Sequence, residues 1–131
     1  MNLPIHLTEN DLHKLRRLLH HARSEAGSDP RSLDRLEGEL DRAVLVQNDA
    51  PPPDLITMNS RVEMINLATG ATVTYTLVFP EYANSDDGHL SVLAPLGMAM
   101  IGYRSGDEFS WPAPGGLIRF RVGKVLGKEP R

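Results

Sequence analysis

Cysteine is absent from this 131-residue sequence, and aromatic residues make up only 5% of it. The absence of cysteine excludes disulfides, thiolate metal sites and thiol catalysis, and it fits a reducing compartment. An excess of basic residues is also missing, since the formal net charge is −3. A general nucleic-acid binder normally carries a strong positive charge. We therefore expect no direct sequence-specific contact with nucleic acid, although a protein partner that itself handles nucleic acid stays open.

Long hydrophobic runs are lacking as well. The longest nearly uncharged apolar stretch, residues 96–103, is far too short to cross a bilayer. The N-terminus has no charged segment followed by an apolar one, so it does not resemble a signal peptide. A hydrophobic content of 40% with 24% charged residues is typical of a globular protein. We expect a cytoplasmic protein with no membrane partner.

The first 50 residues predict a short antiparallel helical hairpin, which we interpret as a coiled coil. Thr8 suits a helix N-cap, and Pro30 suits the first position of a second helix. Apolar residues then recur at spacings of three, four and three residues: Leu12, Leu15, Leu19 and Ala22 in the first helix, and Leu33, Leu36, Leu40 and Ala43 in the second. Such stripes form a seam between two helices. Helices of about 16 residues are roughly 25 Å long.

A proline-rich linker at residues 51–54 separates the hairpin from a predicted second domain, residues 51–131. Period-two patterns and turn residues mark the strands of that domain, above all at 71–79, where an apolar face alternates with hydroxyl groups. The expected strands are 55–58, 61–67, 71–79, 90–93, 108–111 and 117–126, with a short helix at 95–102. This order predicts an α+β fold, an antiparallel sheet with one short helix.

Two carboxylates, Glu25 and Asp29, lie at the predicted tip of the hairpin. Paired carboxylates can hold Mg²⁺, but Asp29 also suits the N-cap of the second helix, with Glu25 solvated, and we favour that reading. The histidines near the N-terminus lack the i, i+4 spacing that two metal ligands on one helix need. No nucleophile with a held base is recognisable. The sequence therefore predicts no catalytic residue, no metal site and no cofactor.

The second half resembles the C-terminal domain of the Gre-type transcript cleavage factors. The segments that carry the resemblance occur in the family's order: residues 66–70, 73–78, 90–92, 94–97, 101–102, 106–108 and 114–116. Residues 56–62, together with the short hairpin and the proline-rich link, resemble the family called regulator of nucleoside diphosphate kinase (Rnk).

The resemblance implies an FKBP-like fold that docks on RNA polymerase at the rim of its secondary channel. In Gre factors the docking loop carries an acidic-Ser-Pro sequence before a short helix, and only Pro95 matches that sequence here. An altered docking mode is therefore expected. The resemblance places the polymerase-binding residues at Ala94, Pro95, Leu96 and Gly97.

A Gre hairpin is much longer and presents tip carboxylates to the catalytic Mg²⁺ of the polymerase. The short hairpin here implies a regulator, not an enzyme, that occupies the channel rim. It would compete with longer channel-binding factors without stimulating transcript cleavage. We separately expect a monomer. Two alternatives stay open: direct regulation of nucleoside diphosphate kinase, and an FKBP-like prolyl isomerase or chaperone whose pocket would use Phe79, Tyr82, Phe109 and Trp111.

Overall fold

The computed structural model describes residues 4–25, 30–47, 52–113 and 115–128. The chain divides into two compact units, Met1–Pro51 and Pro52–Arg131, which we call the helical unit and the sheet unit. Helices and strands both occur, so the predicted mixed composition is confirmed. Independent folding of the two domains stays a prediction. Within the described residues, no helix is long and apolar enough to span a membrane.

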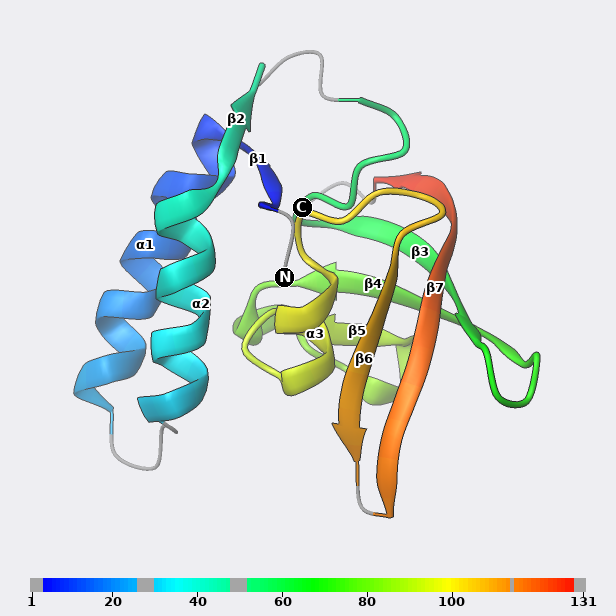
Figure 1. Cartoon of the computed structure of the whole chain (residues 1–131). Helices are drawn as coiled ribbons and strands as arrows, with labels where there is room; N and C mark the ends of the chain where they lie inside the picture. Colours follow the sequence, from blue (N-terminus) through cyan, green and yellow to red (C-terminus); the bar gives the residue numbers. More distant parts are fainter. Residues whose placement is uncertain (1–3, 26–29, 48–51, 114, 129–131) are drawn as a thin grey trace. The chain divides into compact units, whose positions relative to one another are not determined.

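The helical unit is built on two helices, α1 (Glu9–Ser24) and α2 (Pro30–Arg42), which lie side by side and run in opposite directions (Figure 1). The Thr8 hydroxyl accepts a hydrogen bond from the Asp11 amide at 3.1 Å, which caps α1 as expected. The predicted seam supplies the buried residues Leu15, Leu19, Ala22, Leu33, Leu36 and Leu40. The two helices are thus confirmed, and a coiled-coil supercoil stays a prediction.

Two short strands complete the helical unit, and the sequence did not predict them. β1 (His6–Thr8) precedes α1, and β2 (Val44–Val46) follows α2. They pair in parallel, and the Val44 amide donates to the Ile5 carbonyl at 2.8 Å. Each strand has three residues, too few for a recognisable period of two.

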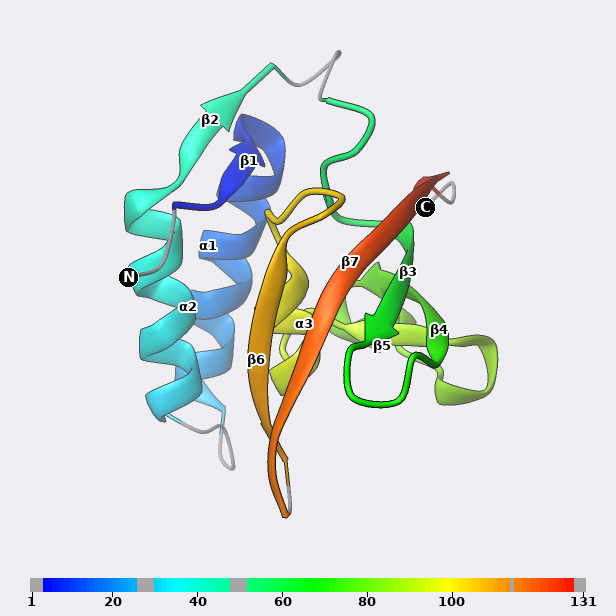
Figure 2. The same ribbon diagram turned by 45° about the vertical axis from the view of Figure 1, so that its right-hand side comes forward.

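The sheet unit contains five strands in the order β5-β4-β3-β7-β6. Their bounds are β3 (Ser60–Asn66), β4 (Thr72–Val78), β5 (His89–Ser91), β6 (Glu108–Ala113) and β7 (Gly116–Lys128). A short helix, α3 (Pro95–Met100), contacts β6, and two 3-10 turns, η1 (Pro80–Tyr82) and η2 (Ser85–Asp87), lie between β4 and β5. Figure 2 shows β6 and β7 as a long twisted hairpin. The FKBP-like description of this unit stays a prediction.

The expectation of a wholly antiparallel sheet is wrong at β5. This strand pairs with β4 in parallel, with His89 opposite Thr76 and Ser91 opposite Val78. The loop between β4 and β5, residues 79–88, is long enough to carry the chain back along β4 before β5 begins. A short loop would have forced an antiparallel hairpin.

The expected strand at 55–58 is also wrong, although these residues are buried. Leu55 makes only an isolated bridge with Arg104. The chain then turns, because the Ser60 amide donates to the Thr57 carbonyl at 3.1 Å and Asn59 adopts a φ of 70°. Leu55, Ile56 and Met58 are therefore apolar because they fill the core, not because they form a strand.

The predicted alternation along β4 holds only in part. Val73, expected on the apolar face, is 39% exposed, whereas Thr76, Leu77 and Val78 are all buried. β3 pairs with residues 72–76 of β4, and β5 pairs with residues 76–78, so β5 adds cover only to the second half of the strand. Burial therefore changes along the strand rather than between its faces.

Candidate functional site

The predicted docking loop is a tight turn between β5 and α3. The Ser91 hydroxyl accepts a hydrogen bond from the Leu93 amide at 3.0 Å, and the Ser91 carbonyl accepts one from the Ala94 amide at 3.0 Å. The Ala94 carbonyl then accepts the Met98 amide at 2.9 Å, which starts α3. These hydrogen bonds define the path of the loop, and the sequence pattern did not predict them.

Gly97 fixes the position of α3 through a close backbone approach. A Cβ atom at this position would lie 2.1 Å from the Ser91 carbonyl oxygen and 3.1 Å from the Val92 Cα. Only glycine allows the helix to pack this closely on the strand backbone. The loop and α3 therefore form one closely packed piece.

The four residues predicted to bind a partner take different places in this piece. Leu96 and Gly97 are buried, so their contribution is to hold the loop in position. Ala94 is half-buried, and its backbone begins the helix at φ −66° and ψ 147°. The Pro95 side chain lies outside the described side chains. Partner binding by these residues stays a prediction, with Ala94 as the accessible position.

The tip of the helical unit is only partly described. Glu25 is exposed and follows α1, where its amide donates to the Ala22 carbonyl at 3.3 Å. Asp29 lies outside the described residues. Across the described part of the chain, no group of three or more histidine and carboxylate side chains is placed to hold a metal ion.

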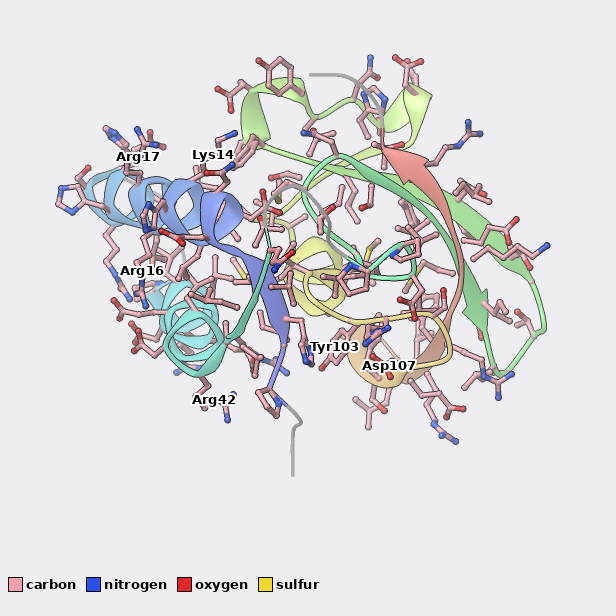
Figure 3. All side chains as sticks on the ribbon, turned by 90° about the horizontal axis from the view of Figure 1, so that it is seen from above. Lys14, Arg16, Arg17, Arg42, Tyr103 and Asp107 are labelled. Atoms are coloured by element: carbon pink, nitrogen blue, oxygen red, sulfur yellow. The ribbon has the colours of Figure 1, made fainter. Side chains whose placement is uncertain are left out.

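Basic side chains of α1 fall into two sets. Arg16 and Arg23 pair with carboxylates of α2: Arg16 with Asp41 at 3.1 Å, and Arg23 with Asp34 at 2.8 Å and Glu37 at 3.0 Å. The hydrogen bond to Asp34 is the main reason why the pKa of Arg23 is raised. Lys14 and Arg17 instead lie on the side of α1 away from α2 (Figure 3). One set ties the helices together, and the other leaves a cationic outer face.

An ion pair anchors the first residues of the sheet unit. The Arg104 guanidinium donates to both carboxylate oxygens of Asp54, at 2.8 and 3.2 Å, and the Ser105 amide donates to the Asp54 carbonyl at 3.0 Å. The hydrogen bond from Arg104 holds the pKa of Asp54 below its usual range. The residue that ends the predicted linker is thus fastened to the turn before β6.

The structure describes three of the four aromatic side chains considered for an isomerase pocket, Phe79, Tyr82 and Phe109, and that alternative stays untested. Phe109 stacks on Tyr103 with ring centroids 5.6 Å apart, and it contacts Phe120 at 5.9 Å. Tyr82 is 43% exposed on η1. The Trp111 side chain lies outside the described side chains. The ring cluster that does form joins Tyr103, which precedes β6, with Phe109 of β6 and Phe120 of β7.

Comparison with known families assigns both parts of the chain. Residues 51–126 match the family described as "Transcription elongation factor, GreA/GreB, C-term". Residues 4–46 match the family described as "Rnk N-terminus". The first match spans more than half of the chain and includes the predicted docking loop, β3 to β6 and all but the last two residues of β7.

Individual relatives agree with this assignment. A protein named regulator of nucleoside diphosphate kinase from Escherichia coli is 44% identical over 84 residues, which are 64% of this chain and 62% of that protein. A transcription elongation factor GreA from Chlorobium phaeovibrioides is 32% identical over 108 residues, which are 82% of this chain and 68% of that protein. The match to the Escherichia coli relative thus spans less than two thirds of its length.

A solved structure gives the same answer. The structure titled prokaryotic transcription elongation factor GreA/GreB from Nitrosomonas europaea has a TM-score of 0.78 and 35% identity, and the match covers 96% of this chain and all of that one. Both the sequence and the fold therefore point to one assignment. The chain belongs to the GreA/GreB transcription elongation factor family, and it carries the Rnk N-terminus in front of the shared C-terminal domain.

Proposed function

We propose that this protein binds bacterial RNA polymerase at the rim of the secondary channel and regulates transcription by occupying that site. Its family consists of transcription elongation factors, which act on the transcribing enzyme. The loop from Ser91 to Gly97 is held in one conformation by hydrogen bonds and by a close backbone contact. A preorganised loop loses little entropy on binding, which supports its use as a docking surface.

We further propose that the protein does not stimulate transcript cleavage. The short length of its helical hairpin supports this proposal. α1 has 16 residues and α2 has 13, which correspond to about 24 and 20 Å. The match to the Chlorobium phaeovibrioides factor is 82% of this chain but only 68% of that protein, so that factor is longer. A short hairpin would leave its tip outside the active centre, so tip carboxylates would not reach the catalytic metal.

Backtracked elongation complexes test the second step. Adding the protein to such complexes, with no other factor present, should leave the rate of transcript shortening at its intrinsic value. A GreA protein added in parallel serves as the positive control. Shortening at a rate comparable to that control would overturn the proposal.

Two variants in which an alanine is replaced by arginine test the docking surface. Ala94→Arg adds a large charged side chain at the half-buried start of α3, and Ala68→Arg adds the same side chain at the exposed turn between β3 and β4. We expect Ala94→Arg to weaken binding to purified polymerase and Ala68→Arg to leave it unchanged. Equal affinity of the two variants would remove this loop from the proposal.

The name of the Escherichia coli relative includes nucleoside diphosphate kinase. We propose that any effect on this kinase is indirect and arises through transcription. A direct effect predicts that the purified protein changes the rate of purified nucleoside diphosphate kinase. We expect no change in that rate, and a saturable change would favour the direct alternative.

A further inference from the structure

The sheet unit has a polar depression on a face of its sheet, lined by residues that precede the docking loop in the sequence. Its volume is about 410 Å³, and its lining residues are Arg61, Thr74, Thr76, Asp87 and His89. They come from β3, β4, β5 and the turn η2. A hollow of this size falls within the range of roughly 300–1,000 Å³ that small-molecule sites occupy.

Strand register brings three of these residues into one row. Arg61 lies directly opposite Thr76, and Thr76 lies directly opposite His89. Residues opposite one another on neighbouring strands point to the same face of a sheet, and so does Thr74, two positions before Thr76. The depression thus has a floor of two hydroxyl groups with a guanidinium on one side and an imidazole on the other.

The far wall of the depression is built by the turn before β5. The Thr76 amide donates to the Gly88 carbonyl at 2.8 Å, and a Cβ at Gly88 would lie 3.2 Å from the Thr74 carbonyl oxygen. Gly88 has a φ of 72°, so the chain can pass close above β4. The Asn84 side-chain amide donates to the Asp87 carboxylate at 3.0 Å, which holds this carboxylate in place.

Three of the groups that face the depression can donate hydrogen bonds to a ligand: the Arg61 guanidinium and the hydroxyl groups of Thr74 and Thr76. Among the described residues, no hydrogen bond or ion pair engages the Arg61 guanidinium or the hydroxyl groups of Thr74 and Thr76. Thr76 is only 4% exposed. Three other arginines of the same unit instead pair with carboxylates: Arg104, Arg119 and Arg121. A guanidinium beside two free hydroxyl donors is a set of groups that suits an oxyanion.

We propose that this depression binds a small phosphate monoester that also carries hydroxyl or amino groups. The guanidinium fork of Arg61 matches two phosphate oxygens, and the hydroxyls of Thr74 and Thr76 can donate to a third. The Asp87 carboxylate repels a second anion but accepts hydrogen bonds from a hydroxyl or an amine. Sugar phosphates and nucleoside monophosphates share this chemistry. The site does not depend on polymerase binding, because it uses none of the docking-loop residues.

Titration of the ¹⁵N-labelled full-length protein, followed by NMR, tests the proposal. The probes are ribose 5-phosphate and adenosine 5′-monophosphate, with ribose and adenosine as controls without phosphate. We expect saturable shifts of the amides at residues 61, 74–76 and 87–89 with at least one phosphate, and none with the controls. Tighter binding of the adenosine phosphate would identify a nucleotide as the source of the group, and equal binding would identify a sugar phosphate.

Two substitutions make the test specific. Arg61→Gln should weaken phosphate binding at least tenfold, as expected for the loss of charge-assisted hydrogen bonds. Arg119→Gln removes the same charge from an exposed position on β7 and should leave the affinity unchanged. The amide spectra of the two variants report directly whether each is folded. Absence of saturable shifts with both phosphates, or equal weakening by the two substitutions, would overturn the proposal.

Discussion

Replacing Gly97 by alanine should destabilise the sheet unit far more than an ordinary helical Gly→Ala change. The new Cβ would lie 2.1 Å from the Ser91 carbonyl oxygen, 3.0 Å from the Ser91 carbonyl carbon and 3.1 Å from the Val92 Cα. All three are backbone atoms, so no change of rotamer relieves the overlap. The shortest contact must lengthen by roughly 1 Å or more before it approaches the ~3.5 Å of a relaxed non-bonded contact.

The structure also sets the size of this effect. Adding atoms to a well-packed site costs about 1–3 kcal/mol, and a clash with backbone on one side and a helix on the other belongs near the upper value. Urea unfolding followed by the fluorescence of Trp111, the only tryptophan, reports on the unit that contains β6. With a slope of about 1–3 kcal/mol per molar urea, the midpoint should fall by roughly 1 M or more.

Gly38 provides a matched control within the same chain. It lies in α2, and a Cβ there would meet nothing within 4 Å. Gly38→Ala should therefore stabilise the helical unit by up to about 1 kcal/mol, measured by circular dichroism during unfolding. A Gly97→Ala protein as stable as the parent would refute the argument from the close approach to Ser91.

Three further predictions concern other parts of the chain. Thr8→Ala removes the acceptor of the Asp11 amide and should cost about 1 kcal/mol of stability in thermal unfolding. Leu36→Ala opens a cavity at a residue that is 1% exposed, and it should cost about 2–5 kcal/mol in the same assay. Because the hydrogen bond from Arg104 lowers the pKa of Asp54, the resulting stabilisation is present above the ordinary aspartate pKa of about 3.9 and is lost as the pH falls through the lowered value. Asp54→Asn should remove that acid-side loss from a profile of urea midpoints against pH, and an unchanged profile would contradict the role of this pair.

The features that could be predicted from the sequence are local ones. The cap at Thr8 and the leucine spacing of α1 and α2 depend on residues within one or two turns of each other. The hydroxyl-rich pattern of β4 is equally local. Short-range physics determines such features, so their residue patterns are visible without a structure.

The features that could not be predicted depend on long-range pairing. β1 and β2 pair with each other although both helices separate them in the sequence. Each strand has only three residues, which give no periodic signal. The parallel direction of β5 depends on the path of residues 79–88. The close approach at Gly97 depends on where α3 meets Ser91, and the row of Arg61, Thr76 and His89 exists only once the register of three strands is known.

Competition in backtracked elongation complexes tests the central claim most directly. The measurement is the rate of GreA-stimulated transcript shortening at a fixed GreA concentration while this protein is added in increasing amounts. If this protein occupies the channel rim that GreA uses and does not stimulate cleavage itself, the rate of transcript shortening should decrease saturably toward its intrinsic value. A rate that stays constant, or one that rises as the protein is added, would contradict the claim.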